Sequence, residues 1–359
     1  MDEPPDGRIL RRRLLETGLA GGLGLAVAGG LVLRNQVRHP HKDKHPAPDG
    51  RARRLVLAVP NQRRDPVLLA ARDQGVFERY KLEIAFADAV GSGQEALDQV
   101  LSGHADGAVA AALSWLPRLQ AELQAATAAP QAGLDARLVC GLQAGSARLL
   151  IPRKSPVRRI EDLHRRAIGI ANPDSPDRLF FSIMMRRKGM DPNRDVEWRA
   201  VPAAALGLAL TEGHVQAIVG HDPAIWQLRE ALHLNELASS MSGSYGVRVS
   251  RVLGLRNRLL HDDPQAAVAI AMAIQEAAIW VAKHPDQVSV LLAAQDPELT
   301  VEQVGRMLKA EGHNVHPSGA NLRNQVAQYI DELKLLGLTP ESVDSAVFAK
   351  RVTAEVLKG

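Results

Sequence analysis

Short apolar runs alternate with amphipathic stretches along most of this chain, from residue 55 to about residue 262. The apolar runs predict strands at Leu55–Val59, Leu82–Phe86, Gly107–Ala111, Arg137–Gly141, Ala147–Ile151, Ala167–Ile170, Val196–Val201, Ala217–Gly220 and Tyr245–Leu255. The stretches between them have a helical period and predict helices such as Val67–Phe77, Gln94–Ser102, Asp177–Lys188 and Ala204–Thr211. This alternation predicts an α/β fold of open, largely parallel, doubly wound sheets with helices on both faces.

One helix–turn–strand unit occurs twice, at a constant offset of 110 residues. Its two copies are Gly103-His104-Ala105-Asp106-Gly107-Ala108-Val109 and Gly213-His214-Val215-Gln216-Ala217-Ile218-Val219. Two copies predict two lobes of related architecture. The glycine after each helix is an ordinary left-handed cap, and that end of the unit faces away from the carboxyl ends of the strands. We therefore expect both histidines to lie away from any ligand.

Beyond Asp263 the pattern changes to helices alone, from Pro264–Lys283 to Ser342–Leu357. We expect this helical tail to pack on the first lobe and to bury its outer face. The length of 359 residues agrees with two lobes, because it exceeds what one hydrophobic core usually serves.

The N-terminus has the pattern of an export signal, predicted over residues 1–33. Arg11-Arg12-Arg13-Leu14-Leu15 precedes a Gly/Ala-rich apolar stretch from Gly18 to Leu33, with small residues at Ala26-Val27-Ala28. Paired arginines before two leucines favour the twin-arginine route over the ordinary secretory route. A membrane anchor is the alternative, although the stretch is shorter than the roughly 20 residues that span a bilayer.

Residues 34–54 are polar and rich in proline, which predicts a disordered linker. This linker holds seven basic and two acidic residues, a charge of +5, and the charges of residues 1–28 cancel. The total charge of +4 therefore leaves −1 for the folded body, which argues against a nucleic-acid partner. The nearby His39, His41 and His45 favour a solvated linker over a metal site, because no other ligand framework surrounds them.

Two features of the composition limit the chemistry. Cys140 is the only cysteine, so an intramolecular disulfide and a thiolate metal cluster are excluded, and its apolar neighbours predict a buried, inert thiol. Aromatic residues make up only 3% of the chain, so a pocket must use backbone groups and small polar side chains. We expect no cofactor and no metal.

Loops at the carboxyl ends of the strands are where an open α/β sheet binds ligands, since the following helices point their N-termini there. Free N–H groups and partial positive charge at these termini bind anions. Four loops fit: Pro60–Asp65, with Asn61; Gly91–Gly93, with Ser92; the segment after Ala111, with Ser114 and Trp115; and Asn172–Asp177, with Asn172 and Ser175.

Helix capping is the alternative role for several of these side chains. Capping alone would satisfy Asn172, Ser175 and Asp177 without a ligand, and the two roles are compatible. Asp222, in His221-Asp222-Pro223, is interpreted first as the N-cap of the helix that carries Trp226. Its alternative roles are binding a ligand amine at the rim of the cleft or bridging the two lobes.

The chain resembles the nitrate/sulfonate/taurine group of ABC-transporter solute-binding proteins, which have the type II periplasmic-binding-protein fold. The resemblance covers Leu55 to Lys358 and is carried by four segments in the same order and spacing. These are Asp65-Pro66-Val67-Leu68-Leu69-Ala70 through Gly75-Val76-Phe77, Leu101-Ser102-Gly103-His104-Ala105-Asp106, Ile151-Pro152-Arg153-Lys154-Ser155-Pro156-Val157 through Asp162-Leu163, and Leu210-Thr211-Glu212-Gly213-His214-Val215-Gln216-Ala217 through Asp222-Pro223.

The resemblance implies a lobe 1 of residues 55–148 and 249–359, a lobe 2 of residues 149–248, and two strands that cross between them near Ala147–Arg153 and Tyr245–Val252. It also implies a monomer in the periplasm that closes on a small anionic ligand and is read by an ABC permease in the inner membrane. By the family pattern Ser114, Trp115, Asn172, Ser175 and Asp222 fall on loops that line the cleft. The His/Lys/Gln set expected of a nitrate or bicarbonate binder is missing. An aliphatic sulfonate is therefore the preferred ligand, with nitrate, taurine and bicarbonate as alternatives.

Two other functions compete with transport. An enzyme on the same fold is disfavoured, since related pyrimidine-forming proteins need a cysteine-rich motif and this chain has neither Gly-x-Ser-x-Gly nor His-Glu-x-x-His. We therefore expect no catalytic residue. A membrane-tethered sensory ligand-binding protein is the other alternative, and retention of residues 1–28 would support it.

Overall fold

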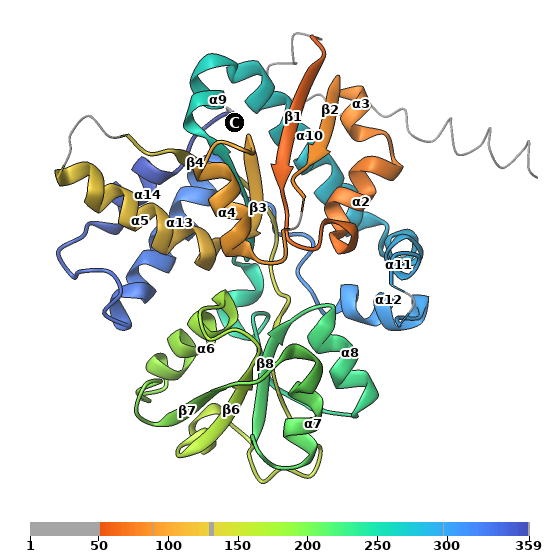
Figure 1. The fold of residues 1–359 in the computed structure, drawn as a ribbon, viewed down its shortest axis with the longest axis vertical. Helices are drawn as coiled ribbons and strands as arrows, with labels where there is room; N and C mark the ends of the chain where they lie inside the picture. Colours follow the sequence, from red (N-terminus) through yellow and green to blue (C-terminus); the bar gives the residue numbers. More distant parts are fainter. Residues whose placement is uncertain (1–50, 89, 129–132, 297, 358–359) are drawn as a thin grey trace, which may run out of the picture. The chain divides into compact units, whose positions relative to one another are not determined.

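A computed structural model describes residues 51–88, 90–128, 133–296 and 298–357. Within them, ten strands form two five-stranded sheets (Figure 1). The export signal predicted at 1–33 and the three linker histidines lie outside the described residues. Residues Pro46–Gly359 cluster as one compact unit.

The first sheet combines the opening strands of the chain with a strand that returns much later. Its order is β2 (Leu82–Phe86), β1 (Arg53–Ala58), β3 (Gly107–Ala111), β10 (Arg251–Arg256) and β4 (Ala136–Gln143). β1 is parallel to β2 and to β3, whereas β10 is antiparallel to β3 and to β4. The helices in this part of the chain are α2 (Pro66–Asp73), α3 (Val76–Arg79), α4 (Gly93–Leu101) and α5 (Ala112–Ala128).

The second sheet has the same plan. Its order is β7 (Val196–Ala200), β6 (Arg166–Ile170), β8 (Ala217–His221), β5 (Ala147–Ile151) and β9 (Asn235–Ser239). β6 is parallel to β7 and β8, and β5 is the antiparallel strand between β8 and β9. The helices of this part are α6 (Pro176–Arg187), α7 (Leu206–Thr211) and α8 (Ala224–Ala231).

The repeated sequence unit occupies matching places in the two sheets. Gly103 and Gly213 both have the left-handed backbone, with φ of 85° and 76°, that ends a helix. The Asp106 side chain accepts from the backbone N–H of Val56 at 2.8 Å, and the Gln216 side chain accepts from that of Ala167 at 3.0 Å. In both sheets the repeat thus ties its strand to a neighbour, β3 to β1 and β8 to β6, by the same side-chain-to-backbone hydrogen bond. This confirms the prediction of two lobes of related architecture.

Several predicted boundaries shift in the structure. β1 begins at Arg53, not after residue 54, because the Arg53 side chain pairs with Asp263 at 2.7 Å and is 6% exposed. The predicted helix over Val67–Phe77 is broken at Gly75, whose φ is 58°. The predicted strand Tyr245–Leu255 starts only at Arg251, after a 3-10 helix over Gly243–Val247. β9 was missed, because Asn-Glu-Leu-Ala-Ser is a short and largely polar edge strand.

The chain crosses between the sheets at residues 144–146 and 248–250. The predicted crossing at Ala147–Arg153 is instead strand β5 of the second sheet, so the first crossing lies just before it. The second crossing lies within the predicted Tyr245–Val252. Backbone bonds tie the two together, since Ser250 N donates to Gln143 O at 2.8 Å.

The helical tail covers the first sheet and also reaches the second lobe. It consists of α9 (Asn257–Asp262), α10 (Pro264–Lys283), α11 (Pro285–Ala293), α12 (Val301–Lys309), α13 (Gly319–Leu335) and α14 (Ser345–Val352). α10 packs against α2 and β4, and α13 and α14 pack together against β4. Gln227 of α8 also donates to Asp296 at 3.0 Å, and Arg187 of α6 pairs with Glu332 of α13 at 2.9 Å. The prediction that the tail packs on the first lobe is therefore confirmed, and the tail also contacts helices α6 and α8.

Two buried features match the sequence. Cys140 is fully buried in β4, and burial raises the pKa of its thiol to about 12, which keeps it protonated and unreactive.

Among the described residues, α10 alone is long and apolar enough to cross a membrane, but 61% of its apolar window is buried inside the protein. The packing of α10 makes it a core helix.

Candidate ligand-binding cleft

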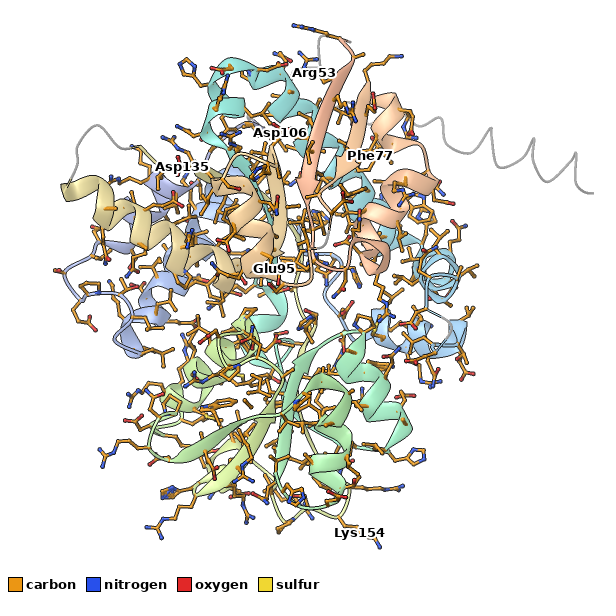
Figure 2. The ribbon with its side chains drawn as sticks, in the orientation of Figure 1. Arg53, Phe77, Glu95, Asp106, Asp135 and Lys154 are labelled. Carbon is orange, nitrogen blue, oxygen red and sulfur yellow. The ribbon has the colours of Figure 1, made fainter. Side chains whose placement is uncertain are left out.

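A cavity of about 580 Å³ lies among the loops at the carboxyl ends of the strands, with walls from both sheets. Its lining includes parts of all four predicted loops and the His221-Asp222-Pro223 segment. Figure 2 shows Glu95, on the loop-side end of α4, at the edge of the first lobe that faces the second, and Asp106 at the opposite edge. The volume falls within the range of small-molecule pockets.

Helix N-termini converge on this cavity. α4 begins after Ser92, whose hydroxyl accepts from Glu95 N at 3.2 Å, which leaves the N–H groups of Gly93 and Gln94 without intrahelical acceptors. Gly93 lies against the first turn of α5, because a Cβ atom at this position would be 2.9 Å from Ser114 Oγ. Two N-termini therefore meet side by side, and α6 opens on the same cavity from the other lobe.

Six of the seven predicted ligand residues line the cavity: Asn61, Ser92, Ser114, Asn172, Ser175 and Asp222. They differ in what their side chains already bind. The side chains of Asn61 and Ser114 have no hydrogen bond to any described residue. Ser175 accepts from Arg178 N at 3.3 Å and Asn172 accepts from Asp174 N at 2.9 Å, so both cap local structure as the alternative interpretation held.

The placement of Trp115 differs from its predicted role. It is fully buried, does not line the cavity, and packs its ring over Gly254 of β10, where a Cβ atom would be 2.4 Å from the indole. Successive residues of a helix are turned about 100° apart, so Ser114 faces the cavity and Trp115 faces the core. That Trp115 is next to Ser114 in the sequence therefore did not predict that it would line the cavity.

Asp222 does not cap a helix. α8 has no side-chain cap at its N-terminus, and both carboxylate oxygens of Asp222 accept from Nε of Arg148 at 2.9 Å. Arg148 also pairs with Glu236 and lies 4.6 Å from the ring centre of Trp226. The predicted cap is therefore a buried ion pair between neighbouring strands, with both partners at most 2% exposed.

A histidine–carboxylate pair lies beside this ion pair. His221 Nδ1 is 2.8 Å from an oxygen of Asp177, and this carboxylate raises the pKa of His221, against the lowering by burial. The His221 side chain lines the cavity and is 58% exposed. Asp177 is thus engaged by a histidine from β8. It lies inside the first turn of α6, whose N-cap is Ser175, so its predicted capping role is wrong.

The four arginines that line the cavity all have carboxylate partners. They form the pairs Arg64–Asp296, Arg118–Asp98, Arg248–Glu332 and Arg251–Asp65. An anion that enters the cavity would therefore compete for these guanidinium groups. The N–H groups of the helix termini, which have no such partners, are its more available donors.

Three parts of the cavity were missed by the sequence analysis. Gln143, at the end of β4, is 3% exposed, and its Oε1 has no donor among the described residues. The rings of Tyr245 and Tyr329 both lie against Arg248, with centres 4.8 and 5.1 Å from the guanidinium. Glu311 comes from the helical tail, which was assigned to the outer face. Only Gln143 carried a signal, as a polar residue that closes an apolar strand.

No group of three His, Cys, Asp or Glu residues in the described parts of the chain is arranged to hold a metal ion. The polar groups of the cavity are hydroxyls, amides, backbone N–H groups and paired charges. This arrangement suits binding of a small polar solute by hydrogen bonds.

Solved structures with the same fold include three whose names state what they bind. The periplasmic aliphatic sulphonate binding protein SsuA from Escherichia coli is 17% identical, with a TM-score of 0.64, over 84% of this chain and 92% of that one. The periplasmic nitrate-binding protein NrtA from Synechocystis PCC 6803 is 14% identical, with a TM-score of 0.63, over 86% and 87%. DszB in complex with biphenyl-2-sulfinic acid is 15% identical, with a TM-score of 0.53, over 83% and 98%.

These likenesses identify the periplasmic-binding-protein fold and confirm the fold predicted from the sequence. No curated protein matches the chain in sequence. The NMT1-like family, in contrast, matches residues 58–293, about two thirds of the chain and most of both sheets. The chain therefore belongs to the NMT1-like family.

Proposed function

We propose that this protein is the periplasmic solute-binding component of an ABC importer. It binds a small anionic solute in the cavity and delivers it to a permease in the inner membrane. The observation that carries the proposal is the convergence of the N-termini of α4, α5 and α6 on one cavity, where N–H groups without intrahelical acceptors surround the space for a ligand. The sulphonate-binding and nitrate-binding proteins among the structural neighbours support the same class.

The size and lining of the cavity favour an organic anion. A volume of about 580 Å³ has room for about 19 water molecules at roughly 30 Å³ each, far more than nitrate or bicarbonate displaces. Apolar side chains line part of the wall: Leu113, Leu179, Phe180, Leu292 and Met307. An aliphatic sulfonate can place its charged group at the helix termini and its alkyl chain on this wall, so it remains the preferred ligand.

The sequence supports the proposed location and assembly. The arginines at 11–13 and the apolar stretch after them support export by the twin-arginine route, and the acidic balance of the body supports a protein without a nucleic-acid partner. We propose a monomer. If the N-terminal segment is retained, the same domain would act as a membrane-tethered sensor, which N-terminal sequencing of the mature protein distinguishes.

A thermal-denaturation screen of the full-length protein tests the proposal. The ligands are alkanesulfonates, taurine, nitrate, bicarbonate, thiamine precursors and amino acids, with sodium chloride at equal ionic strength as the control. A ligand that binds only the folded state stabilises it by about 2.7 kcal/mol at a hundredfold excess over its Kd, so we expect a sulfonate to raise the midpoint. An unchanged midpoint with every anion would refute the assignment.

A further inference from the structure

Two buried carboxyl groups lie beside the segment that first crosses between the sheets. Asp222 follows β8 and Glu311 follows α12, and their side chains line the cavity and are 1% and 4% exposed. Asp222 N donates to Ser146 O at 2.9 Å. Ala144 N donates to Gly312 O at 2.9 Å and Gly312 N to Ala144 O at 3.1 Å, which fixes the residue after Glu311 to the same segment. The two carboxyl groups lie within hydrogen-bond reach of each other.

This pair joins two parts of the molecule that can move against each other. β8 is the central strand of the second sheet, whereas α12 packs on α11, and α11 packs on α2 of the first lobe. The chain passes between the sheets at residues 144–146 and 248–250, where changes in a few backbone angles can open or close the cavity. A contact between Asp222 and Glu311 therefore spans the two lobes beside the first crossing.

The charges around the pair favour one shared proton. Both carboxylate oxygens of Asp222 accept from Nε of Arg148 at 2.9 Å, and Arg148 also pairs with Glu236. Glu311 has His313 Nε2 at 2.7 Å. With every acid ionised, one guanidinium would stand against three carboxylates, and a charged His313 would still leave an excess of negative charge. Two carboxylates also cannot hydrogen-bond to each other without a proton, so protonation of one of them stabilises the pair.

The other charged groups near the pair have partners of their own. His221, next to Asp222 in the chain, has an oxygen of Asp177 at 2.8 Å from its Nδ1 atom. Arg251 pairs with Asp65. These groups are therefore neutralised locally and do not supply the carboxyl pair with a second cation.

Burial and the neighbouring acid retain the proton at neutral pH. Burial first, and then the carboxylate of Glu311, raise the pKa of Asp222 to about 8, against the lowering by Arg148. Because interacting carboxyl groups titrate as a pair, the folded protein holds one proton between them where the unfolded chain, with a carboxyl pKa of about 4, holds none. The contribution of this proton to the free energy of unfolding is complete below about pH 4 and is lost as the pH rises to about 8.

We propose that the hydrogen bond between Asp222 and Glu311 is a pH-sensitive latch that holds the two lobes closed around the cavity. With the shared proton, the pair ties the end of β8 to the segment after α12. Without it, two buried carboxylates repel each other and become hydrated by moving apart, so the cavity opens beside the first crossing. The latch goes beyond the proposed function, because it acts on the protein with or without a ligand.

Energy transfer between two pH-insensitive fluorophores on the full-length protein tests the latch. Arg258→Cys on α9 and His214→Cys after α7 provide labelling positions on the two lobes, where the native side chains are 77% and 66% exposed. The labels react there alone, because Cys140 is fully buried. We expect the transfer efficiency to fall as the pH rises from 6 to 10, with a midpoint near pH 8. An unchanged efficiency over this range would overturn the proposal.

Two variants separate the latch from other titrations. In Asp222→Asn and in Glu311→Gln an amide N–H donates to the remaining carboxylate and loses no proton in this range, so the efficiency should stay at its neutral-pH value. Glu236→Gln is the matched control and should keep the fall, since Glu236 also pairs with Arg148 but does not line the cavity. The same fall in Asp222→Asn and Glu311→Gln as in the wild type would also overturn the proposal. The measurement uses no ligand, so its failure is distinct from a failure of the anion screen.

Discussion

Replacement of Arg148 by methionine is expected to lower the free energy of unfolding by about 3–5 kcal/mol. Arg148 is 2% exposed and supplies the countercharge for Asp222, at 2.7 Å, and for Glu236. Methionine has a similar length but leaves Asp222 buried without a cation, next to Glu311. Removal of one partner of a buried pair is costly because the other remains charged and desolvated.

Urea denaturation followed by circular dichroism measures this loss. Arg306→Met is the control, because Arg306 also bridges two carboxylates, Glu230 and Glu302, but its side chain is 46% exposed. Water can replace such a partner, so the control should lose much less. Similar losses in the two variants would show that Arg148 is not the centre of a buried charge network.

Replacement of Trp115 by alanine is also expected to cost about 3–5 kcal/mol, through the cavity it leaves in the core. The ring is fully buried and fills the space left by Gly254. Its indole N–H has no acceptor among the described residues, so the loss comes from packing alone. Affinity of the folded protein for ethanesulfonate should stay within about twofold, because Trp115 does not line the cavity.

Ser114→Ala, one residue away, is the matched variant for this test. It should leave stability nearly unchanged and weaken ethanesulfonate binding about 3- to 10-fold, the effect of one lost hydrogen bond. Urea denaturation and titration on both proteins separate the two roles. If Trp115→Ala loses binding and keeps its stability, the sequence-based assignment of Trp115 to the ligand site was right.

The architecture could be predicted from the sequence because the patterns that indicate strands and helices lie within short segments of the chain. The period of apolar residues located nine of the ten strands described, and the repeat at Gly103 and Gly213 revealed the common plan of the two sheets. Loops at the carboxyl ends of strands could be placed on the cavity by the same reasoning, since strand direction follows from the alternation with helices. Asn61, Ser92 and Asn172 were found in this way.

The side-chain partners could not be predicted, because they join distant parts of the chain. Arg148 lies 74 residues before Asp222, and nothing in the sequence near either one indicates the pair. Glu311 enters the cavity from a tail whose amphipathic helices predicted only packing. Successive residues of a helix also point in different directions, as Ser114 and Trp115 do. A segment can therefore be placed correctly at the cavity while the residue within it that lines the cavity is predicted wrongly.

Gly93 offers a way to test whether an anion binds at the N-termini of α4 and α5. Gly93→Ala places a methyl group 2.9 Å from Ser114 Oγ, where the two termini meet. Gly305→Ala in α12 is the control, because Gly305 does not line the cavity and its nearest neighbour would be 3.4 Å away. Titration with ethanesulfonate should show at least a tenfold rise in Kd for Gly93→Ala and none for Gly305→Ala. Equal affinity in the two variants and the wild type would show that no anion binds at these helix termini.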